Sequence, residues 1–208
     1  MGWSTESNIY WNRNIFTMLT SGVQSLCMPD HPERGMFWVQ LSLNARPDVT
    51  MFVTTAHLPW KGCATEVATG VDQRRVTTAL AVDFLRGVRE QAAHSGDVLV
   101  VGGDFNDDWV PTSLLREGLG LQDVFEAIDC PPPSTHPTRP SHPREERQPD
   151  HTLDWIMTTA SADGKGQCRV LSAHCKRVRG GTSPPPSDHM PVLCVCELTW
   201  ALKECVYL

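Results

Sequence analysis

The sequence predicts an α/β fold in which two packed, mixed β-sheets are flanked by helices, a four-layer α/β sandwich. Three observations lead to this prediction: strand-like runs outnumber helical ones, two of these runs form a hairpin, and a strand–helix–strand unit follows. The same pattern excludes a helical bundle. A length of 208 residues with 40% apolar residues fits one domain, residues 1–208, with a sizeable core.

The hairpin is predicted from two different apolar patterns. Residues 36–43 alternate between apolar and polar side chains, which indicates a half-buried strand. A turn over 44–48 leads into 49–56, where almost every residue is apolar or β-branched. Such a run suits a strand that is covered on both faces.

A helix and a further strand follow the hairpin. Apolar residues recur at helical spacing over about 71–89, which predicts a long amphipathic helix. Residues 97–101 are typical of a strand, and Gly102 and Gly103 allow a tight turn directly after it. Asp104 is therefore expected at the carboxyl end of a strand.

The second half of the chain alternates short elements with long loops. Short helices are predicted over 111–117 and 124–128, and strands over 152–157, 169–173 and 191–198. The runs 130–150 and 180–187 are rich in proline or other turn-forming residues and lack apolar periodicity. We expect both to be flexible loops, the first long enough to serve as a lid.

Charge and composition narrow the class of protein. A net charge of −6 opposes a non-specific grip on long nucleic acid, and the adjacent Arg74 and Arg75 are expected to lie on a solvated face. The sequence contains no transmembrane segment or signal pattern, and its eight cysteines are scattered. These features predict a soluble, intracellular protein in a reducing compartment. A zinc site near His174 and Cys175 is a less favoured alternative, because their spacing fits no tetrahedral motif.

Polar motifs stand at or near the ends of predicted strands. They are Thr55-Ala56-His57-Leu58, Gly103-Asp104-Phe105-Asn106, Leu153-Asp154-Trp155-Ile156 and Ser187-Asp188-His189. Hydrolysis of a phosphate ester needs an activated water, relief of charge on the phosphoryl oxygens and help for the leaving oxygen. Carboxylates, an amide and histidines can supply these functions. Each motif alone also has a structural interpretation: a turn that caps a helix, a buried strand aspartate, a core histidine or a turn before a strand.

In this order, the motifs resemble those of the endonuclease/exonuclease/phosphatase superfamily, the DNase I-like hydrolases, over about residues 8–198. The resemblance implies Mg²⁺-dependent hydrolysis, with Mn²⁺ as an alternative ion. It assigns water activation to Asp104, and stabilisation of the phosphoryl group to a pair formed by His189 and Asp154. Asp188 and Asp104 would be the metal ligands. The resemblance also implies catalytic roles for His57 and Asn106, which would contact the substrate together with Gln73 and Arg34.

The amino-terminal region departs from the family pattern. Members open with a strand that ends in asparagine and a second strand that ends in glutamate, the principal magnesium ligand. Neither Glu6 nor Asn8 ends an apolar strand, and residues 9–12 resemble a later strand of that fold. We therefore expect a DNase I-like fold that is missing its first strands.

Two functions remain open at this point. The first is a phosphodiesterase, nuclease or phosphatase that acts on a nucleotide, a nucleic acid, or a lipid or other small phosphate. In that case Trp60 and Trp109 could stack on a base. The second is a catalytically weak or inactive phosphate-binding module, or a gene fragment, that lacks the metal-binding glutamate. The sequence indicates no protein partner, and whether the chain is an active enzyme stays undecided.

Overall fold

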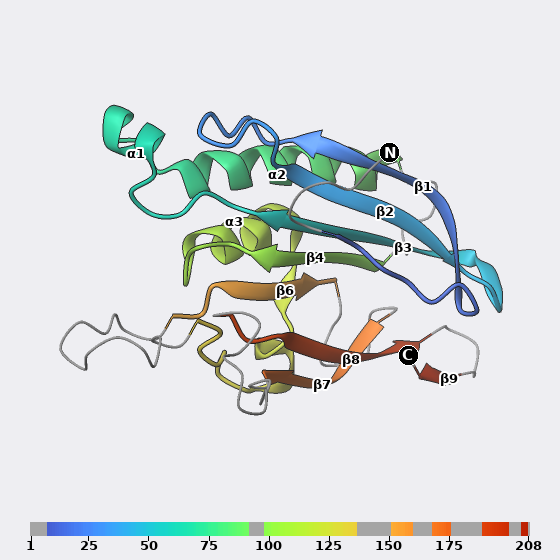
Figure 1. Ribbon diagram of the computed structural model, residues 1–208. Coiled ribbons are helices and arrows are strands. Elements are labelled where there is room, and N and C mark those ends of the chain that lie inside the picture. The colour runs from blue at the N-terminus through green and yellow to red at the C-terminus, as the bar shows by residue number, and fades with distance from the viewer. Residues whose placement is uncertain are drawn as a thin grey trace, which may run out of the picture.

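The computed structural model describes residues 8–91, 98–136, 151–159, 168–175, 189–199 and 205–207 (Figure 1). Its elements in chain order are β1 (Phe16–Ser25), β2 (Gly35–Leu43), β3 (Arg46–His57), α1 (Ala64–Thr69), α2 (Gln73–Gln91), β4 (Val98–Asp104), α3 (Val110–Leu119), β5 (Gln122–Asp123), the 3₁₀-helix η1 (Glu126–Ile128), β6 (Asp154–Thr158), β7 (Cys168–Cys175), β8 (Val192–Thr199) and β9 (Cys205–Tyr207). They form a six-stranded mixed sheet, in the order β1-β2-β3-β4-β6-β5, and a three-stranded antiparallel sheet, β7-β8-β9. The predicted two-sheet α/β class is confirmed.

The predicted hairpin is also confirmed, since β2 and β3 pair antiparallel from Phe37↔Thr55 to Ser42↔Thr50. The prediction that residues 9–12 form a strand is wrong. Asn12 instead accepts backbone hydrogen bonds from the amides of Ile15 and Phe16, so the chain turns there and β1 starts at Phe16. Most β1 side chains are exposed on this edge strand, so the segment lacks the apolar alternation by which strands are recognised.

The strand directions create one polar edge on the large sheet. β4 runs parallel to β3, and β6 runs antiparallel to β4. The carboxyl ends of β3 and β4 therefore lie where β6 begins, as Figure 1 shows. This edge, with His57, Asp104 and Asp154 at its strand ends, is called the polar edge below.

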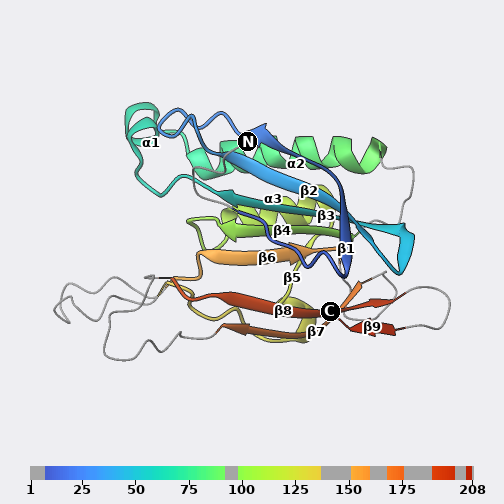
Figure 2. The ribbon, with the colours of Figure 1, turned by 45° about the vertical axis from the view of Figure 1, so that its right-hand side comes forward.

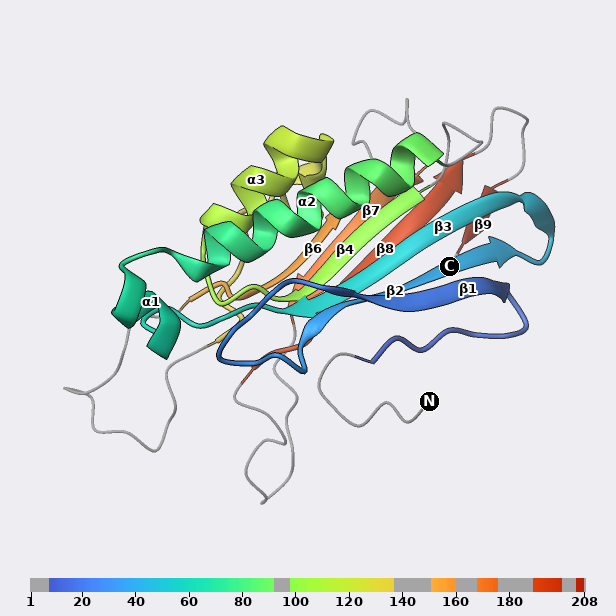
Figure 3. The ribbon, with the colours of Figure 1, turned by 90° about the horizontal axis from the view of Figure 1, so that it is seen from above.

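Two apolar cores lie on opposite faces of the large sheet. On β4, Leu99 and Val101 belong to the core beneath α2 and α3, whereas Val98 and Val100 belong to the core shared with β7 and β8. Figure 3 shows both helices on one face of the sheet, and Figure 2 shows the small sheet beside β6, away from the helices. Burying each large aliphatic side chain contributes about 1.5–3 kcal/mol. The two cores thus fix the sheet whose edge carries the polar motifs.

The helices differ little from their predicted ranges. The long helix starts at Gln73, while the segment expected to be helical at 124–128 forms only the 3₁₀-helix η1. No helix in the described ranges is both long enough and apolar enough to cross a membrane. Residues 137–150 of the first predicted loop and the whole of the second, 180–187, lie outside the described residues.

Candidate active site

The strand register alone brings together polar side chains from distant parts of the chain. His57 and Asp104 are register partners at the ends of β3 and β4, and Asp154 is the partner of Asp104 at the start of β6. The His57 Nε2 atom lies 3.5 Å from Asp104 Oδ2. Three of the predicted site residues are therefore neighbours because they occupy equivalent positions on adjacent strands.

Gly103 makes this close approach possible. Its φ angle is +137°, a conformation that side chains other than glycine rarely adopt. A Cβ atom at this position would lie 2.0 Å from the backbone oxygen of Ala56, so any side chain would collide with β3. After Gly103, the amide of Leu58 donates to the Asp104 carbonyl at 2.9 Å, which ties the end of β3 to the same turn.

Asn106 completes the turn with a left-handed backbone conformation, φ 51°. Its backbone N–H donates to Asp104 Oδ1 at 2.9 Å, and its side-chain Nδ2 donates to the Leu58 carbonyl at 2.8 Å. The amide of Asn106 is thus held against the polar edge. Asparagine tolerates this backbone region better than most residues, which explains why it can occupy the position.

His189 reaches the polar edge from the segment that precedes β8. Its Nδ1 lies 2.7 Å from Asp154 Oδ2, and its Nε2 lies 3.8 Å from Asp104 Oδ2. A carboxylate partner favours a proton on Nδ1. The other ring nitrogen, Nε2, faces Asp104. The structure therefore brings the predicted histidine and aspartate together, although β6 and β8 belong to different sheets.

The electrostatic environment distinguishes Asp104 from an ordinary surface carboxylate. Burial raises the pKa of Asp104, and the nearby Asp154 raises it further, while the hydrogen bond from Asn106 and the proximity of His57 and His189 act in the opposite direction. Its side chain is 17% exposed. A carboxylate with a raised pKa is a stronger base, which suits it to accept a proton from water.

The donor set fits a divalent metal ion. Asp104, Asp154 and His189 each offer one ligand atom, and these atoms all lie within 4.8 Å of one another. Carboxylate oxygens suit Mg²⁺ and Mn²⁺, and imidazole is a common additional ligand for transition-metal ions. The other predicted metal ligand, Asp188, lies outside the described residues.

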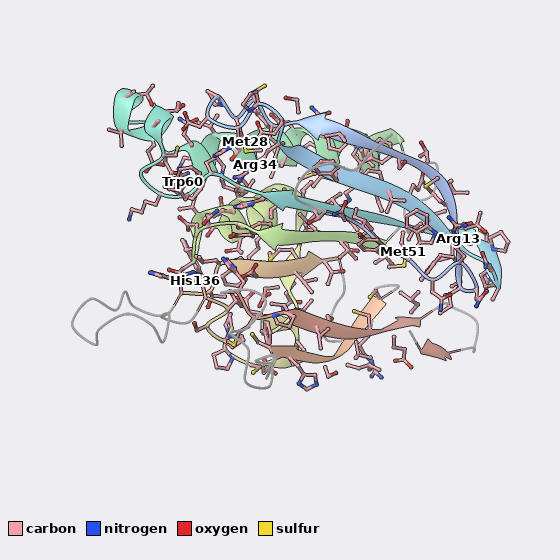
Figure 4. The ribbon with its side chains drawn as sticks, in the orientation of Figure 1. Arg13, Met28, Arg34, Met51, Trp60 and His136 are labelled. Carbon is pink, nitrogen blue, oxygen red and sulfur yellow. The ribbon has the colours of Figure 1, made fainter. Side chains whose placement is uncertain are left out.

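Of the two other predicted substrate contacts, Gln73 is buried and Arg34 is half-buried. Gln73 is 7% exposed at the start of α2, and its Nε2 donates to the Val71 carbonyl at 3.0 Å. Arg34 is half-buried in the turn before β2. Figure 4 shows Arg34, Trp60 and His136 at the polar-edge end of the molecule, with Met51 toward the opposite end. The roles of Gln73 and Arg34 in substrate binding stay predictions.

The predicted stacking residues are both exposed. Trp60 is 45% exposed and its ring lies 5.2 Å from the ring of His31, measured between centroids. Trp109 is 63% exposed and lies beneath the guanidinium of Arg116, 5.9 Å from the ring centroid. Stacking on a base stays a prediction for both.

The expectation that Arg74 lies on a solvated face is wrong. Its side chain is 3% exposed and forms ion pairs with Glu66, Asp72 and Asp107 at 2.9–3.2 Å. Asp107 also accepts the backbone N–H of Val110, the first residue of α3. This buried network holds the loop that follows Asn106. Only the three-dimensional arrangement brings these acids around one arginine, so two adjacent arginines in the sequence gave no sign of it.

Sequence reasoning also missed residues 133–136, referred to below as the 133–136 segment. It passes beside the site, where the His136 ring lies edge-on to the His189 ring with centroids 4.8 Å apart. The adjacent Thr135 is completely buried. The segment lies within the proline-rich run predicted as a loop, and a run without periodicity gives no signal of burial. The polar triplet Ser134-Thr135-His136 is the one local feature that could have indicated a role.

Comparison with solved structures identifies the fold. The chain is similar to the human Nocturnin catalytic domain with bound sulfate anion, with a TM-score of 0.62 and 18% identity, over 90% of this chain and 62% of that one. It is also similar to D. rerio TDP2 complexed with a single-strand DNA product, with a TM-score of 0.59 and 13% identity over 88% of this chain and 69% of that one. A third similar structure is a Bacteroides thetaiotaomicron mannosyl-6-phosphatase, with a TM-score of 0.60 and 17% identity over 88% of this chain and 67% of that one.

These likenesses show an endonuclease/exonuclease/phosphatase-like fold. The chain spans about two thirds of the length of these structures. No protein-family model and no curated protein matches the sequence, so the relationship is one of structure.

Proposed function

We propose that this protein hydrolyses a phosphate ester in a reaction that depends on a divalent metal ion. The observation that carries the proposal is the convergence of four separate segments on the polar edge. They place Asp104 within 3.8 Å of two imidazoles, one of which is paired with Asp154 at 2.7 Å. The shared fold of Nocturnin, TDP2 and a mannosyl-6-phosphatase supports phosphate-ester chemistry in general.

In the proposed reaction, Asp104 acts as the base. A water oxygen attacks the phosphorus atom and gives its proton to Asp104, while the bond to the leaving oxygen breaks. Asn106 has two hydrogens on Nδ2, and one of them donates to Leu58, so the other can be directed to a phosphoryl oxygen.

His189 supplies positive charge in this proposal. Its Nδ1–H donates to Asp154, which stabilises the imidazolium form and directs Nε2 toward the phosphoryl group. His57 lies on the other side of Asp104 and can contact a second phosphoryl oxygen. A divalent ion held by Asp104, with Asp188 as a further proposed ligand, would neutralise charge on the phosphoryl oxygens.

The net charge of the chain bears on the class of substrate that we propose. A net charge of −6 opposes tight, non-specific binding of long nucleic acid. We therefore favour a nucleotide or another small or lipid phosphate ester over duplex DNA. Trp60 and Arg34, which lie at the same end of the molecule as the site, would contribute to its binding (Figure 4).

The test is hydrolysis of bis(p-nitrophenyl) phosphate and p-nitrophenyl phosphate with Mg²⁺ or Mn²⁺, with and without a chelator. We expect metal-dependent release of p-nitrophenol that falls about 100-fold or more in Asp104→Asn. Asp83→Asn is the matched control, because Asp83 is a 70% exposed carboxylate paired with Arg86 on the helix surface. It should keep the wild-type rate.

Two results would overturn the proposal. The first is a rate that is equal in Asp104→Asn and wild type, which would indicate contamination or chemistry elsewhere. The second is binding of inorganic phosphate without hydrolysis at high protein concentration, insensitive to the chelator. That result would instead identify the protein as a phosphate-binding module.

A further inference from the structure

The 133–136 segment connects the two residues of the His189–Asp154 pair. Asp154 begins β6 in the large sheet, whereas His189 precedes β8 in the small sheet. A hydrogen bond of 2.7 Å between side chains on two different sheets requires both backbones to be held in place. Thr135, with an exposed fraction of 0%, lies between these two backbones.

Thr135 forms hydrogen bonds both to the start of β6 and to the segment that precedes β8. Its side-chain Oγ1 accepts the backbone N–H groups of Leu153 and Asp154, each at 2.9 Å. Its backbone carbonyl accepts the N–H of Met190, the residue directly after His189, at 2.8 Å. Its own N–H donates to the His151 carbonyl at 2.9 Å. One buried residue is therefore hydrogen-bonded both to the backbone of Asp154 and to the backbone next to His189.

We propose that Thr135 is the positioning residue of the site and that it aligns Asp154 with His189 for the reaction. The inference rests on the proposed function, since it assigns a role in the same site. Two successive N–H groups that share one hydroxyl fix the backbone direction at the start of β6, and so fix where the Asp154 side chain points. The carbonyl then sets the distance of the His189 backbone from that point.

The chemistry of threonine suits this role. A buried N–H without an acceptor is strongly unfavourable, so loss of the hydroxyl would force residues 153 and 154 to shift toward other partners. Branching at Cβ restricts rotation of the side chain, which keeps Oγ1 directed at both amides. Valine has nearly the same shape without the acceptor, whereas serine keeps the acceptor without the methyl group. These two substitutions therefore separate hydrogen bonding from packing.

The kinetic test compares Thr135→Val, Thr135→Ser and wild type in metal-dependent hydrolysis of bis(p-nitrophenyl) phosphate. Thr135→Val should lower kcat about 10- to 100-fold with KM changed by less than about threefold, because misalignment of catalytic groups affects the reaction more than substrate binding. Thr135→Ser should recover most of kcat. Thr77→Val is the matched control, because Thr77 is equally buried and its hydroxyl bonds to the Gln73 carbonyl within α2.

A second readout does not depend on activity. The proton on His189 Nδ1 is hydrogen-bonded to a carboxylate and should give a downfield ¹H resonance, assigned by its absence in His189→Gln. We expect Thr135→Val to weaken or shift this resonance, and Thr135→Ser and Thr77→Val to leave it in place. If wild type shows the resonance but no hydrolysis, the proposed function fails while the positioning role is still decided by this signal.

Either of two outcomes overturns the inference. One is a Thr135→Val variant with the resonance and kcat of wild type. The other is an equal effect of Thr135→Val and Thr77→Val on the resonance and on the melting temperature, which would mean that Thr135 contributes only to general stability.

Discussion

The two oxygens of the Asp104 carboxylate face different partners. Oδ1 accepts the backbone N–H of Asn106, whereas Oδ2 lies 3.5 Å from His57 and 3.8 Å from His189. The first contact fixes the orientation of the side chain, and the second oxygen points toward the imidazoles. The carboxylate is thus held in one orientation by Oδ1, which leaves Oδ2 for the proton transfer proposed above.

The His189–Asp154 pair should behave as one unit. Asp154→Asn keeps the shape of the side chain but removes the charge that stabilises the imidazolium, so we expect kcat to fall about 100-fold. His189→Gln should cost a similar factor. The double variant should be little worse than either single variant, because each substitution already disables the pair. Steady-state kinetics of the three variants would measure these effects on kcat. A loss in the double variant equal to the product of the two single losses would contradict the pairing.

At the level of elements, the sequence predicted the parts of the fold that have a strong period. The strands of the β2–β3 hairpin and the helix α2 pack apolar faces against the core, so their apolar residues recur with a regular period. β1 escaped prediction because it is a largely exposed edge strand, and α1, β5 and β9 because they are too short to show a period.

The same reasoning explains which site residues could be predicted. His57, Asp104 and Asp154 stand at strand ends, where sequence position and spatial position coincide. Thr135 and Arg74 act through contacts with residues far along the chain, and such contacts leave no local pattern. The predicted ligand Asp188 stays a prediction.

Gly103 in β4 and Gly87 in α2 should respond in opposite ways to the same substitution. Gly103→Ala should destabilise the protein by about 3 kcal/mol or more, because it combines a φ of +137° with a clash of 2.0 Å against backbone. Gly87→Ala, in the middle of α2, should stabilise it by about 0.5–1 kcal/mol, since the added methyl group meets nothing within 4 Å. Urea unfolding of both variants would measure this difference. Similar free energies of unfolding for the two would contradict the geometry at Gly103.

At the scale of the whole molecule, one buried carboxyl group makes stability depend on pH. Asp123 is 1% exposed, and burial raises its pKa from 3.8 to about 6. Its Oδ2 accepts the backbone N–H groups of Phe125 and Glu126. Between these two pKa values the folded protein binds a proton that the unfolded chain has released, so this contribution to stability falls as pH rises.

The expected size of this effect can be tested directly. A pKa difference of about 2 units between the folded and unfolded states corresponds to about 3 kcal/mol of folding stability. The protein should lose this stability as the pH rises from 3.8 to about 6, with no further loss from Asp123 at higher pH. Asp123→Asn cannot ionise, so its stability relative to wild type should improve across this window. Urea unfolding of both proteins at several pH values would measure it, with Asp83→Asn as the exposed control. A difference between wild type and Asp123→Asn that does not change with pH would contradict the raised pKa.

The parallel pairing of β3 with β4 has a kinetic consequence. Such a pair can form only after the segment that contains α1 and α2 has crossed back over the sheet, and loop closure of this kind slows refolding. Helical circular dichroism should therefore recover early after dilution from denaturant. The proposed hydrolytic activity should return only with the slowest phase, because the residues of the proposed site come from β3, β4, β6 and the segment before β8, which lie far apart in the sequence.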